Sequence, residues 1–598
     1  MTVPAFLPTP AQSSRTPRAR LRTARLLALA LAAVACAAPD GSAAQSSADT
    51  RTSAAPADPL AAWREAQART SAGEWPQAAA AWARVAEANP HAGGAWYELG
   101  RAHFNAGDMR ASMAPFERAV ALGAGRPQNA ALNLARAHAA QGDRDKALGW
   151  LERALALGWR SREQLWRDSL LAPLRGDARF RRLTRYADVP ADRTQGWAHD
   201  LDLLAVEVER MNPNPWRKTP REVFLREVAR LKADVPRLTD AQMYARVMAL
   251  LGLIGDGHTG IPPQAVPGWG SRSLPVIFRI FPDGLYVVAA APAHAALVGA
   301  RVTEVAGRPA AAVLDSLRAF GGEDNERGWL RKTPWLLRYP QLLHAAGLAP
   351  EAERVRLTLR TPGGEARTLE LAVEPVELGP SERTMGRPGW AQAFDRAPGP
   401  VPLYLKDRWR AYWFEHLPAE RTVYFQFNRV RNDSAESVAA FAARLGRFLN
   451  ENAVERLVVD LRWNNGGNTL LVTPLLAAIM GAPRVNRPGG VVVLADRYTY
   501  SAAMNFATYL ERFTPSIFVG EPTSSDPNFI GEDNFIELPY SRLPVGISDL
   551  FWQASWPFDR RTWIAPQVYV EPSFADFAAK RDPVLEAALR LPLDPGGG

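Results

Sequence analysis

One serine in the C-terminal part of the chain has the setting of a nucleophile. Ser501 follows the apolar run Gly490–Asp496, which predicts a short buried strand, and it precedes the helical segment Asn505–Leu510. A serine at a strand-to-helix corner exposes its hydroxyl, while the amide of Ala502 and the helix N-terminus can stabilise negative charge. A serine that only caps the helix would occupy the same position, so the corner alone does not assign a role.

A second loop could supply the other half of such a site. Leu457–Arg462 predicts another buried strand, and the loop that leaves it contains the pair Gly466 and Gly467. Glycines there let backbone amides converge on a small anion, which is what a developing oxyanion needs. The pair lacks the lysine and the spacing of a phosphate-binding loop.

His258 also has a distinctive setting. The segment Met243–Ile254 has helical apolar spacing and runs into Gly255–Thr259, a glycine-flanked corner from which a histidine can protrude. We expect this corner to be exposed and to carry little packing. A lone histidine is more often a surface or capping residue than a catalytic one, so the corner makes His258 a candidate only.

Helices and then strands are expected between residues 196 and 376. Asp200–Met211 and Phe224–Leu231 have helical apolar spacing. The following segment alternates in the manner of strands. The expected strands are Leu274–Phe281, Leu285–Ala290, Ala300–Val305, Val355–Leu359 and Thr368–Val373. Within it, Leu297–Pro309 resembles the later part of a PDZ domain, where a strand meets a tight glycine turn.

A repeat of about 35 residues precedes these elements. Trp82, Phe116 and Leu151 occupy matching helical positions, and polar turns separate the paired helices. The pattern resembles the tetratricopeptide repeat, a helix–turn–helix unit that stacks into a solenoid and usually binds peptides or partner proteins. Trp166–Phe180 resembles a capping segment. A generic bundle of helical hairpins is the alternative, and such arrays also serve as spacers.

The N-terminal residues indicate export. A basic stretch, Arg15–Arg25, precedes the apolar run Leu26–Ala35, which is long enough for a signal peptide and too short to span a membrane. Residues 1–36 are therefore expected to be a signal peptide, and the protein is expected in the cell envelope. Residues 37–58 lack apolar periodicity and predict a flexible tether.

The sole cysteine, Cys36, bears on how the chain is anchored. Ala33–Cys36 resembles a lipobox, in which the cysteine is acylated and becomes the new N-terminus. Cleavage after Ala44, which would give a freely soluble exported protein, is the alternative. A single cysteine leaves no partner for an intramolecular disulfide.

Composition excludes several other classes of protein. With 598 residues the chain is too long for one hydrophobic core. The 47% of apolar and 22% of charged residues argue against wholesale disorder. The formal charge of +9 comes mostly from arginines spread along the chain, without a basic run interleaved with aromatic residues, so nucleic-acid binding is not expected. We expect no cofactor and no metal, since no dinucleotide loop or cluster of metal ligands is evident.

Several segments together resemble one protein family. They match, in order, the core of the tail-specific (C-terminal processing) proteases and the related tricorn protease core, and the resemblance covers roughly residues 196–592. The motifs that carry it are Leu253–Thr259, Asp460–Gly467, Thr499–Ala502, Phe518–Thr523, Trp563–Pro566 and Arg581–Leu585.

This resemblance implies a multidomain α/β protein. It would consist of an N-terminal α-helical tetratricopeptide-like solenoid, a helical subdomain, a PDZ-like β module and an α/β serine peptidase core of the crotonase or ClpP type. The expected boundaries are 59–185 for the repeats, 196–266 for the helical part, 270–378 for the PDZ-like module and 400–592 for the core.

The resemblance also indicates which residue is the base. In the processing proteases the base is a lysine that follows the serine, but here the only lysine after Ser501 is Lys580, far along the chain. The tricorn-like branch uses a histidine from the N-terminal part of the module, and the matching residue is His258. Nucleophile and base need only meet in space.

The group that orients the base is left open. The candidates are Asp256, Glu521 and Asp526, each of which also suits a structural role. Other histidines of the module (His294, His344 and His416) match no family motif.

The implied reaction is acyl transfer on a peptide or protein substrate. Ser501 would attack a carbonyl after His258 takes its proton, and the amides of Gly467 and Ala502, in a loop shaped by Gly466, would hold the oxyanion. With a histidine base the rate should rise through an ionisation between about 6 and 7.5. The superfamily also has non-enzymatic relatives, among them a retinoid-binding protein of the eye, so an inactive scaffold or ligand-binding protein is the alternative.

Overall fold

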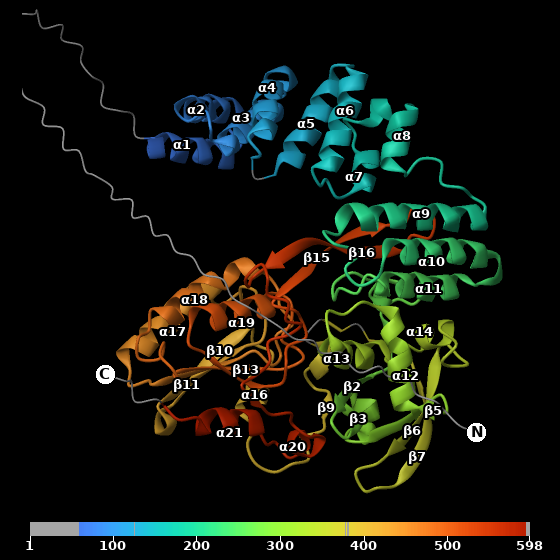
Figure 1. Cartoon of the computed structure of the whole chain (residues 1–598), viewed down its shortest axis with the longest axis vertical. Helices are drawn as coiled ribbons and strands as arrows, with labels where there is room; N and C mark the ends of the chain where they lie inside the picture. The colour runs from blue at the N-terminus through green and yellow to red at the C-terminus, as the bar shows by residue number, and fades with distance from the viewer. Residues whose placement is uncertain (1–58, 125, 377, 380–381, 594–598) are drawn as a thin grey trace, which may run out of the picture. The chain divides into compact units, whose positions relative to one another are not determined.

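The structure, a computed structural model, describes residues 59–124, 126–376, 378–379 and 382–593 (Figure 1). The expected signal peptide, Cys36 and the tether 37–58 lie outside these residues. The described residues combine helices with several sheets, which confirms the mixed α/β class expected from the sequence. None of their helices has the length and apolar character needed to cross a bilayer.

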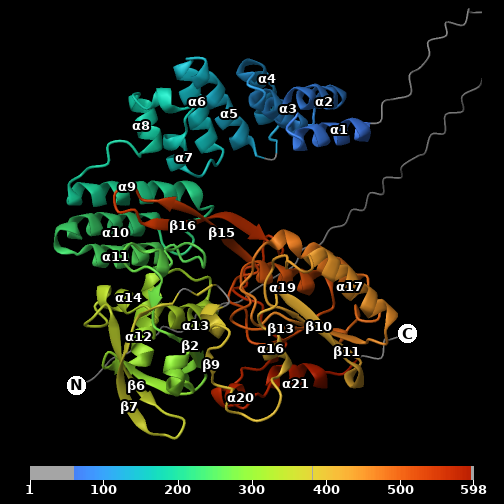
Figure 2. The same cartoon turned by 180° about the vertical axis from the view of Figure 1, so that it is seen from behind.

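The repeat region is a series of helices that pack against their neighbours in chain order (Figures 1 and 2). Trp82, Phe116 and Leu151, the matching positions of the repeat, are all buried in it. The helices are α1 (Pro59–Ser71), α2 (Trp75–Ala88), α3 (Gly93–Asn105), α4 (Met109–Ala121), α5 (Pro127–Ala140), α6 (Arg144–Ala156), α7 (Arg162–Arg167) and α8 (Ala178–Thr184).

Three further helices follow: α9 (Arg193–Met211), α10 (Arg221–Asp234) and α11 (Asp240–Gly252). The Asp192 side chain caps α9 by accepting a hydrogen bond from the Gln195 amide. The expected boundary at Gly196 therefore falls inside a helix, because the cap that starts it lies four residues earlier. Buried Glu207 of α9 forms an ion pair with Arg162 of α7, so contacts also cross that boundary.

The next part of the chain is an antiparallel sheet in the order β2-β3-β4-β6-β7, with β5 beside β4 and β9 beside β3. All five strands expected between residues 274 and 376 are present. The strands are β2 (Val276–Phe281), β3 (Gly284–Ala290), β4 (Arg301–Val305), β5 (Arg308–Pro309), β6 (Arg354–Arg360), β7 (Ala366–Ala372) and β9 (Ala391–Gln392), and β1 (Arg272–Ser273) pairs separately with β8 (Glu374–Pro375).

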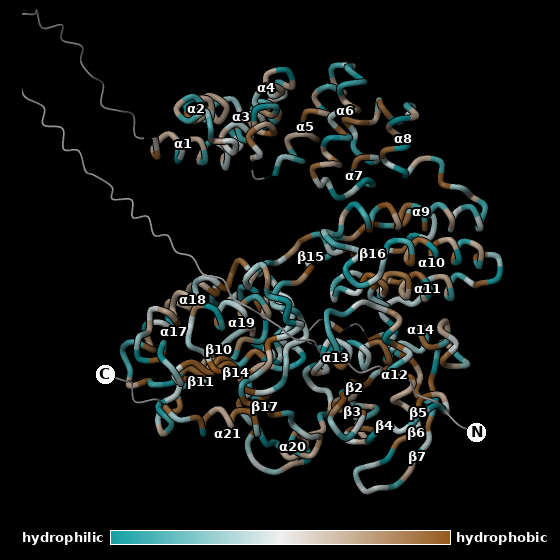
Figure 3. The backbone as a smooth tube through the Cα atoms, viewed as in Figure 1, coloured by the Kyte–Doolittle hydropathy of each residue, from teal (hydrophilic) through white to brown (hydrophobic). Residues whose placement is uncertain are grey.

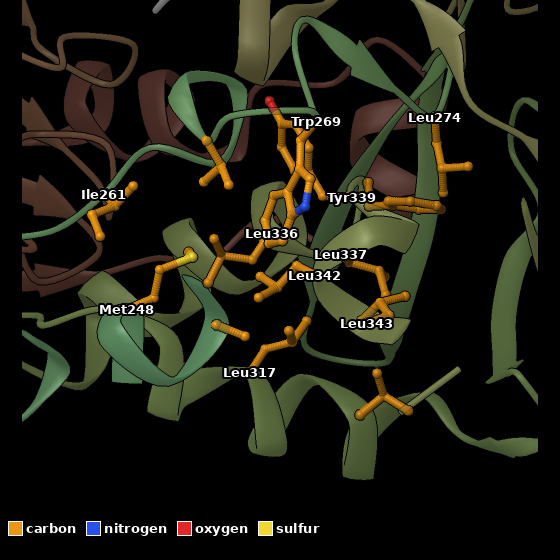
Figure 4. Packing of buried hydrophobic residues seen from close by; sticks show 14 of the residues in the cluster. Met248, Ile261, Trp269, Leu274, Leu317, Leu336, Leu337, Tyr339, Leu342 and Leu343 are labelled. Atoms are coloured by element: carbon orange, nitrogen blue, oxygen red, sulfur yellow. The ribbon is translucent and has the colours of Figure 1, made fainter. Parts of the chain in front are cut away.

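One hydrophobic core joins this sheet to the helices around it. Met248 of α11, Leu317 and Leu336 converge there, each almost fully buried (Figure 4). The fully buried guanidinium of Arg338 donates to the Val276 carbonyl oxygen and so ties the end of α13 to β2. The helices on this sheet are α12 (Ala310–Leu317), α13 (Glu326–Leu336), α14 (Pro340–Ala345) and α15 (Glu382–Met385).

The C-terminal part is built on a six-stranded sheet in the order β10-β11-β12-β13-β14-β17. Only β10 is antiparallel to its neighbour. Every residue of β12 and β13 is buried, as expected for central parallel strands, and the hydrophobic colour of this sheet stands out in Figure 3. The strands are β10 (Tyr412–Leu417), β11 (Thr422–Phe427), β12 (Arg456–Asp460), β13 (Val491–Ala495), β14 (Ile517–Gly520) and β17 (Val568–Tyr569).

Helices cover both faces of this sheet. Val459 of β12 packs in one cluster with α17, α18 and α19, whereas Val458 packs in another cluster with α21. These helices are α17 (Val438–Glu451), α18 (Thr473–Met480), α19 (Ala502–Phe513) and α21 (Pro583–Arg590), with short α16 (Leu403–Lys406) and α20 (Phe574–Ala578) beside them.

The sheet topology places two loops at one edge. Strands β12 and β13 are adjacent and parallel, with Asp460 opposite Leu494, so the loops that follow them leave from the same side. Buried Arg462 fixes the first loop, since its guanidinium lies 2.6 Å from the Asp460 carboxylate and 2.7 Å from that of Asp582. Asp582 also caps α21, which explains the aspartate of the C-terminal motif.

A separate hairpin of β15 (Asn528–Glu537) and β16 (Pro544–Gln553) contacts segments that come much earlier in the chain. Gly546 exchanges backbone hydrogen bonds with Gly260, two residues after His258. The Asp200 carboxylate of α9 accepts the amides of Tyr540 and Ser541 at the hairpin turn. The hairpin is thus held by the helices that precede the sheet.

Candidate active site

Ser501 lies in a strained turn between β13 and α19. Its backbone has φ 57° and ψ −126°, a region that residues other than glycine rarely adopt. Such strain at a strand-to-helix turn is the geometry that presents a nucleophilic hydroxyl. The Ser501 side chain makes no capping hydrogen bond to α19. Helix capping therefore does not account for this serine.

The Ser501 hydroxyl faces His258 instead. Ser501 Oγ lies 3.1 Å from Nε2 of the imidazole. This distance is within hydrogen-bonding range, so the structure brings together the two residues that the sequence proposed as nucleophile and base.

Asp256 builds the corner that carries His258. Its carboxylate accepts hydrogen bonds from the amides of His258 and Thr259 and from the side chains of Asn212, Thr259 and Ser548. A carboxylate this fully engaged shapes the backbone. Asp256 is one of the three candidates for orienting the base, but its side-chain contact is with the His258 backbone rather than the ring.

The imidazole is enclosed by aromatic rings, contrary to the exposed corner expected from the sequence. The ring of Tyr500 stacks with it, with centroids 4.6 Å apart and planes at 19°, and the ring of Phe529 from β15 lies nearly parallel to it at 5.7 Å and 9°. The expectation of an exposed corner was wrong because Phe529 of the β15–β16 hairpin contacts the imidazole, and the sequence around His258 does not reveal this contact. His258 is half-buried and its packing is substantial.

Tyr500 occupies the position for which a carboxylate was considered. Its hydroxyl lies 2.7 Å from Nδ1 of His258, on the side of the ring opposite Ser501. Glu521 pairs instead with Arg497 and Arg327, and Asp526 pairs with Arg217. The signals that could have found Tyr500 are its place next to Ser501 and the absence of a side chain at Gly257, where a Cβ would lie 2.5 Å from the phenolic oxygen.

Tyr500 is itself held in place by Arg331. The guanidinium of Arg331 lies 3.8 Å from the centre of its ring, and Arg331 pairs with Glu323 at 3.0 Å. Burial raises the pKa of Tyr500 well above its ordinary value, so the phenol stays neutral. A neutral phenol can accept a hydrogen bond from Nδ1 or donate one to it.

The electrostatic surroundings keep His258 neutral. Burial lowers the pKa of His258 to about 4, and the nearby Asp256 carboxylate only partly opposes this effect. The expected ionisation between about 6 and 7.5 assumes the ordinary pKa of a histidine, about 6.5. Enclosure by Tyr500 and Phe529 is the physical reason for the correction.

The glycine loop packs directly against the serine turn. Gly466 has φ +99°, and a Cβ there would lie 2.7 Å from Ser501 Cβ. Its amide donates to Asn464 Oδ1, so Gly466 shapes the loop. Gly467 has φ +139°, and a Cβ there would lie 2.2 Å from the Val430 carbonyl oxygen. The loop thus requires both glycines.

Two amides near Ser501 are available to an incoming oxygen. Within the described part of the chain, the amides of Gly467 and Ala502 have no hydrogen-bond acceptor, and the Ala502 nitrogen would lie only 2.8 Å from a Cβ on Gly466. The structure therefore places the expected oxyanion donors on two touching segments beside the nucleophile.

The remaining candidates lie elsewhere. His294 contacts Glu374, His344 contacts the Ala349 carbonyl oxygen, and His416 packs on Phe448. The ammonium group of Lys580 donates to the carbonyl oxygens of Ala397 and Gly399. Across the ranges that the structure describes, no group of three or more His, Cys, Asp or Glu side chains could hold a metal ion.

A cavity of about 400 Å³ opens beside His258. His258, Tyr500 and Asn465 are among the residues that line it, together with aromatic residues from three distant segments, Phe278, Trp335 and Phe535. A cavity of this size beside a reactive pair is suited to hold part of a substrate.

The comparisons with known proteins give distant structural neighbours. No protein-family model and no curated protein matches the sequence. Mature CPAF is similar with a TM-score of 0.48 and 14% identity, over 66% of this chain and 96% of that one. A photosystem II D1 C-terminal processing protease has a TM-score of 0.32 and 15% identity, over 66% and 96%. The tricorn protease has a TM-score of 0.32 and 13% identity, over 66% and 36%. The last two are named for the groups of proteases that the sequence motifs resemble.

Proposed function

We propose that this chain is a serine peptidase of the tail-specific and tricorn-like superfamily, which works through an acyl-enzyme on Ser501. One observation carries the proposal: Ser501 Oγ lies 3.1 Å from His258 Nε2 and beside the unengaged amides of Gly467 and Ala502. Nucleophile, base and oxyanion donors are the parts that acyl transfer requires.

In the first step His258 Nε2 takes the proton of Ser501 Oγ while Oγ forms a bond to the substrate carbonyl carbon. The carbonyl oxygen becomes negatively charged and accepts hydrogen bonds from Gly467 and Ala502. When the carbon–nitrogen bond breaks, His258 gives its proton to the leaving amine. Water then attacks the acyl-enzyme by the same route and releases the second product.

This sequence of steps requires one tautomer of His258. Nε2 must be free to accept a proton, so Nδ1 carries the hydrogen and donates it to the Tyr500 oxygen 2.7 Å away. After proton transfer the imidazolium keeps that hydrogen bond, and the stacked rings of Tyr500 and Phe529 hold its plane. Tyr500 acts through His258 and is a positioning residue.

A hydrolysis assay tests the proposal. Wild type should hydrolyse fluorogenic peptides or activated esters, and Ser501→Ala should be inactive while its circular dichroism is unchanged. A folded wild type that hydrolyses no member of a broad peptide and ester panel would instead support the inactive scaffold or ligand-binding protein.

We further propose that the repeats bind a peptide or a protein partner. A cavity of about 680 Å³ lies along them and is lined mainly by the first helix of each successive pair, with Trp63 from α1, Tyr97 from α3 and Asn129 from α5, and also by Trp82 from α2. Aromatic and amide side chains on such a surface suit an extended peptide. A pull-down with the full chain and with Tyr97→Ala tests this role.

We also propose that the protein is exported and anchored through an acylated Cys36, on the basis of the N-terminal sequence alone. Cell fractionation of wild type and Cys36→Ser tests it. Wild type is expected with the membrane and the variant in the soluble fraction of the envelope.

A further inference from the structure

We propose that the cavity beside His258 binds the substrate residue that follows the scissile bond, and that it selects a large apolar side chain there. The proposal rests on the acyl-enzyme function proposed above. It assigns the specificity of the site to the leaving-group side.

The position of the cavity is the first reason. His258, Tyr500 and Asn465 line it, whereas Ser501, Gly467 and Ala502 do not. The scissile carbonyl must lie between Ser501 Oγ and the two amides, because it is attacked by one and held by the others. The leaving nitrogen must face His258 Nε2, because it takes its proton from that atom. The residue that carries this nitrogen therefore lies on the side where the cavity opens.

The lining of the cavity is the second reason. Phe278 of β2, Trp335 of α13 and Phe535 of β15 present aromatic surface to it from three elements that are distant in sequence. About 400 Å³ is ample for an aromatic or long aliphatic side chain. Burying such a side chain against aromatic walls is favourable, whereas glycine would leave the space filled only by water.

Charge is the third reason. The cations on the lining are Arg331, Lys332 and Arg383, and its one carboxylate belongs to Asp533. Glu323, which pairs with Arg331 and Lys332, does not line the cavity. A lysine or arginine side chain entering here meets three cations and one carboxylate on the lining itself, so we expect the cavity to take an uncharged side chain better than a cationic one.

Acyl transfer to added amines isolates this half of the site. An amino-acid amide attacks the ester carbonyl carbon of the acyl-enzyme, a carbon–nitrogen bond forms and the bond to Ser501 Oγ breaks. The proton of the amine passes to His258 Nε2 and then to Oγ. The amide product divided by the hydrolysis product therefore measures how well each amine is bound, independently of the acyl group.

The experiment uses the full chain and an activated ester, with glycine, leucine, phenylalanine and arginine amides as acceptors. Phenylalanine and leucine amides should capture the acyl group at least about tenfold better than glycine amide, since one buried side chain of this size is worth that factor or more. Arginine amide should do no better than glycine amide. Product ratios are read by mass spectrometry.

Three variants sharpen the test. Phe535→Ser, on the exposed face of the hairpin, and Trp335→Ala should each bring phenylalanine amide close to glycine amide. Phe558→Ser is the matched control, because Phe558 is 85% exposed and lies outside the cavity, and it should leave the ratios unchanged.

The outcomes separate the two proposals. Equal capture of all amides by an acyl-enzyme that forms normally overturns the assignment of the cavity alone. Variants that alter only the preference for the acyl group would place the cavity on the other side of the scissile bond, which also overturns it. Failure to form any acyl-enzyme overturns the proposed function, and this inference with it.

Discussion

The hydroxyl of Tyr500 lies 2.7 Å from Nδ1 of His258, and the two rings stack with their centroids 4.6 Å apart. One residue thus holds the imidazole both at its edge and at its face. A neutral phenol takes the place that a carboxylate has in a Ser-His-Asp triad.

Tyr500→Phe should separate the effect of the hydrogen bond to His258 from the effect of ring stacking. The ring remains and the hydroxyl is lost, so kcat should fall about 10- to 100-fold, the effect of one hydrogen bond to a group that becomes charged. KM and the melting temperature should change little. Tyr509→Phe, within α19 and away from His258, serves as control. Full activity of Tyr500→Phe would remove Tyr500 from the mechanism.

His258 should matter for both rate and stability. His258→Ala and His258→Gln should each lower turnover by about 10²- to 10⁴-fold, since neither side chain can accept the Ser501 proton. His258→Ala also removes the ring that stacks with Tyr500 and with Phe529, so its free energy of unfolding should drop by about 1 kcal/mol or more. Urea unfolding and steady-state kinetics check both effects. Activity retained in either variant would point to another base.

The pH dependence should show a histidine that is hard to protonate. Because the pKa of His258 is lowered to about 4, the base is already neutral above pH 5, and kcat/KM should rise through about pH 4 and then stay level. An ionisation between about 6 and 7.5 would contradict the enclosure of the ring.

The contribution of His258 to the free energy of unfolding should also depend on pH. The pKa of His258 is lower in the folded protein than its ordinary value of about 6.5, so the unfolded chain binds the extra proton first. The contribution of His258 to stability should therefore be complete above about pH 6.5 and be lost as the pH falls toward 4. The difference in unfolding free energy between wild type and His258→Gln, measured across this window, isolates it.

Gly467→Ala should damage the oxyanion site without touching the Ser-His pair. A Cβ there would lie 2.2 Å from the Val430 carbonyl oxygen, so the loop must shift and its amide with it. Turnover should fall by about 10²- to 10³-fold, as for the loss of one oxyanion donor. Gly149→Ala in α6 is the control, because a Cβ there meets nothing within 4 Å. Unchanged turnover of Gly467→Ala would exclude this amide from the oxyanion site.

The sequence predicted the features that depend on local pattern. The apolar runs Leu457–Arg462 and Gly490–Asp496 predict two buried strands, and their parallel pairing is enough to bring Gly467 and Ser501 to one edge of the sheet. The glycine corner predicted a turn at His258, and the family resemblance supplied its pairing with Ser501.

Features that depend on distant contacts could not be predicted in this way. Phe529 reaches His258 through the hairpin, and the direction of the Tyr500 ring depends on Arg331 from α13. The Arg162–Glu207 ion pair likewise crosses the expected boundary at Gly196. Such contacts join residues far apart in the chain, and no local periodicity records them.

The most direct test of the central claim is labelling with a fluorophosphonate, which reacts only with a serine whose proton is removed by a neighbouring base. The account predicts one label per chain, located by peptide mapping at Ser501, none in Ser501→Ala, and labelling at least about 100-fold slower in His258→Gln. A folded wild-type protein that takes up no label, or takes it up at another residue, would contradict the account.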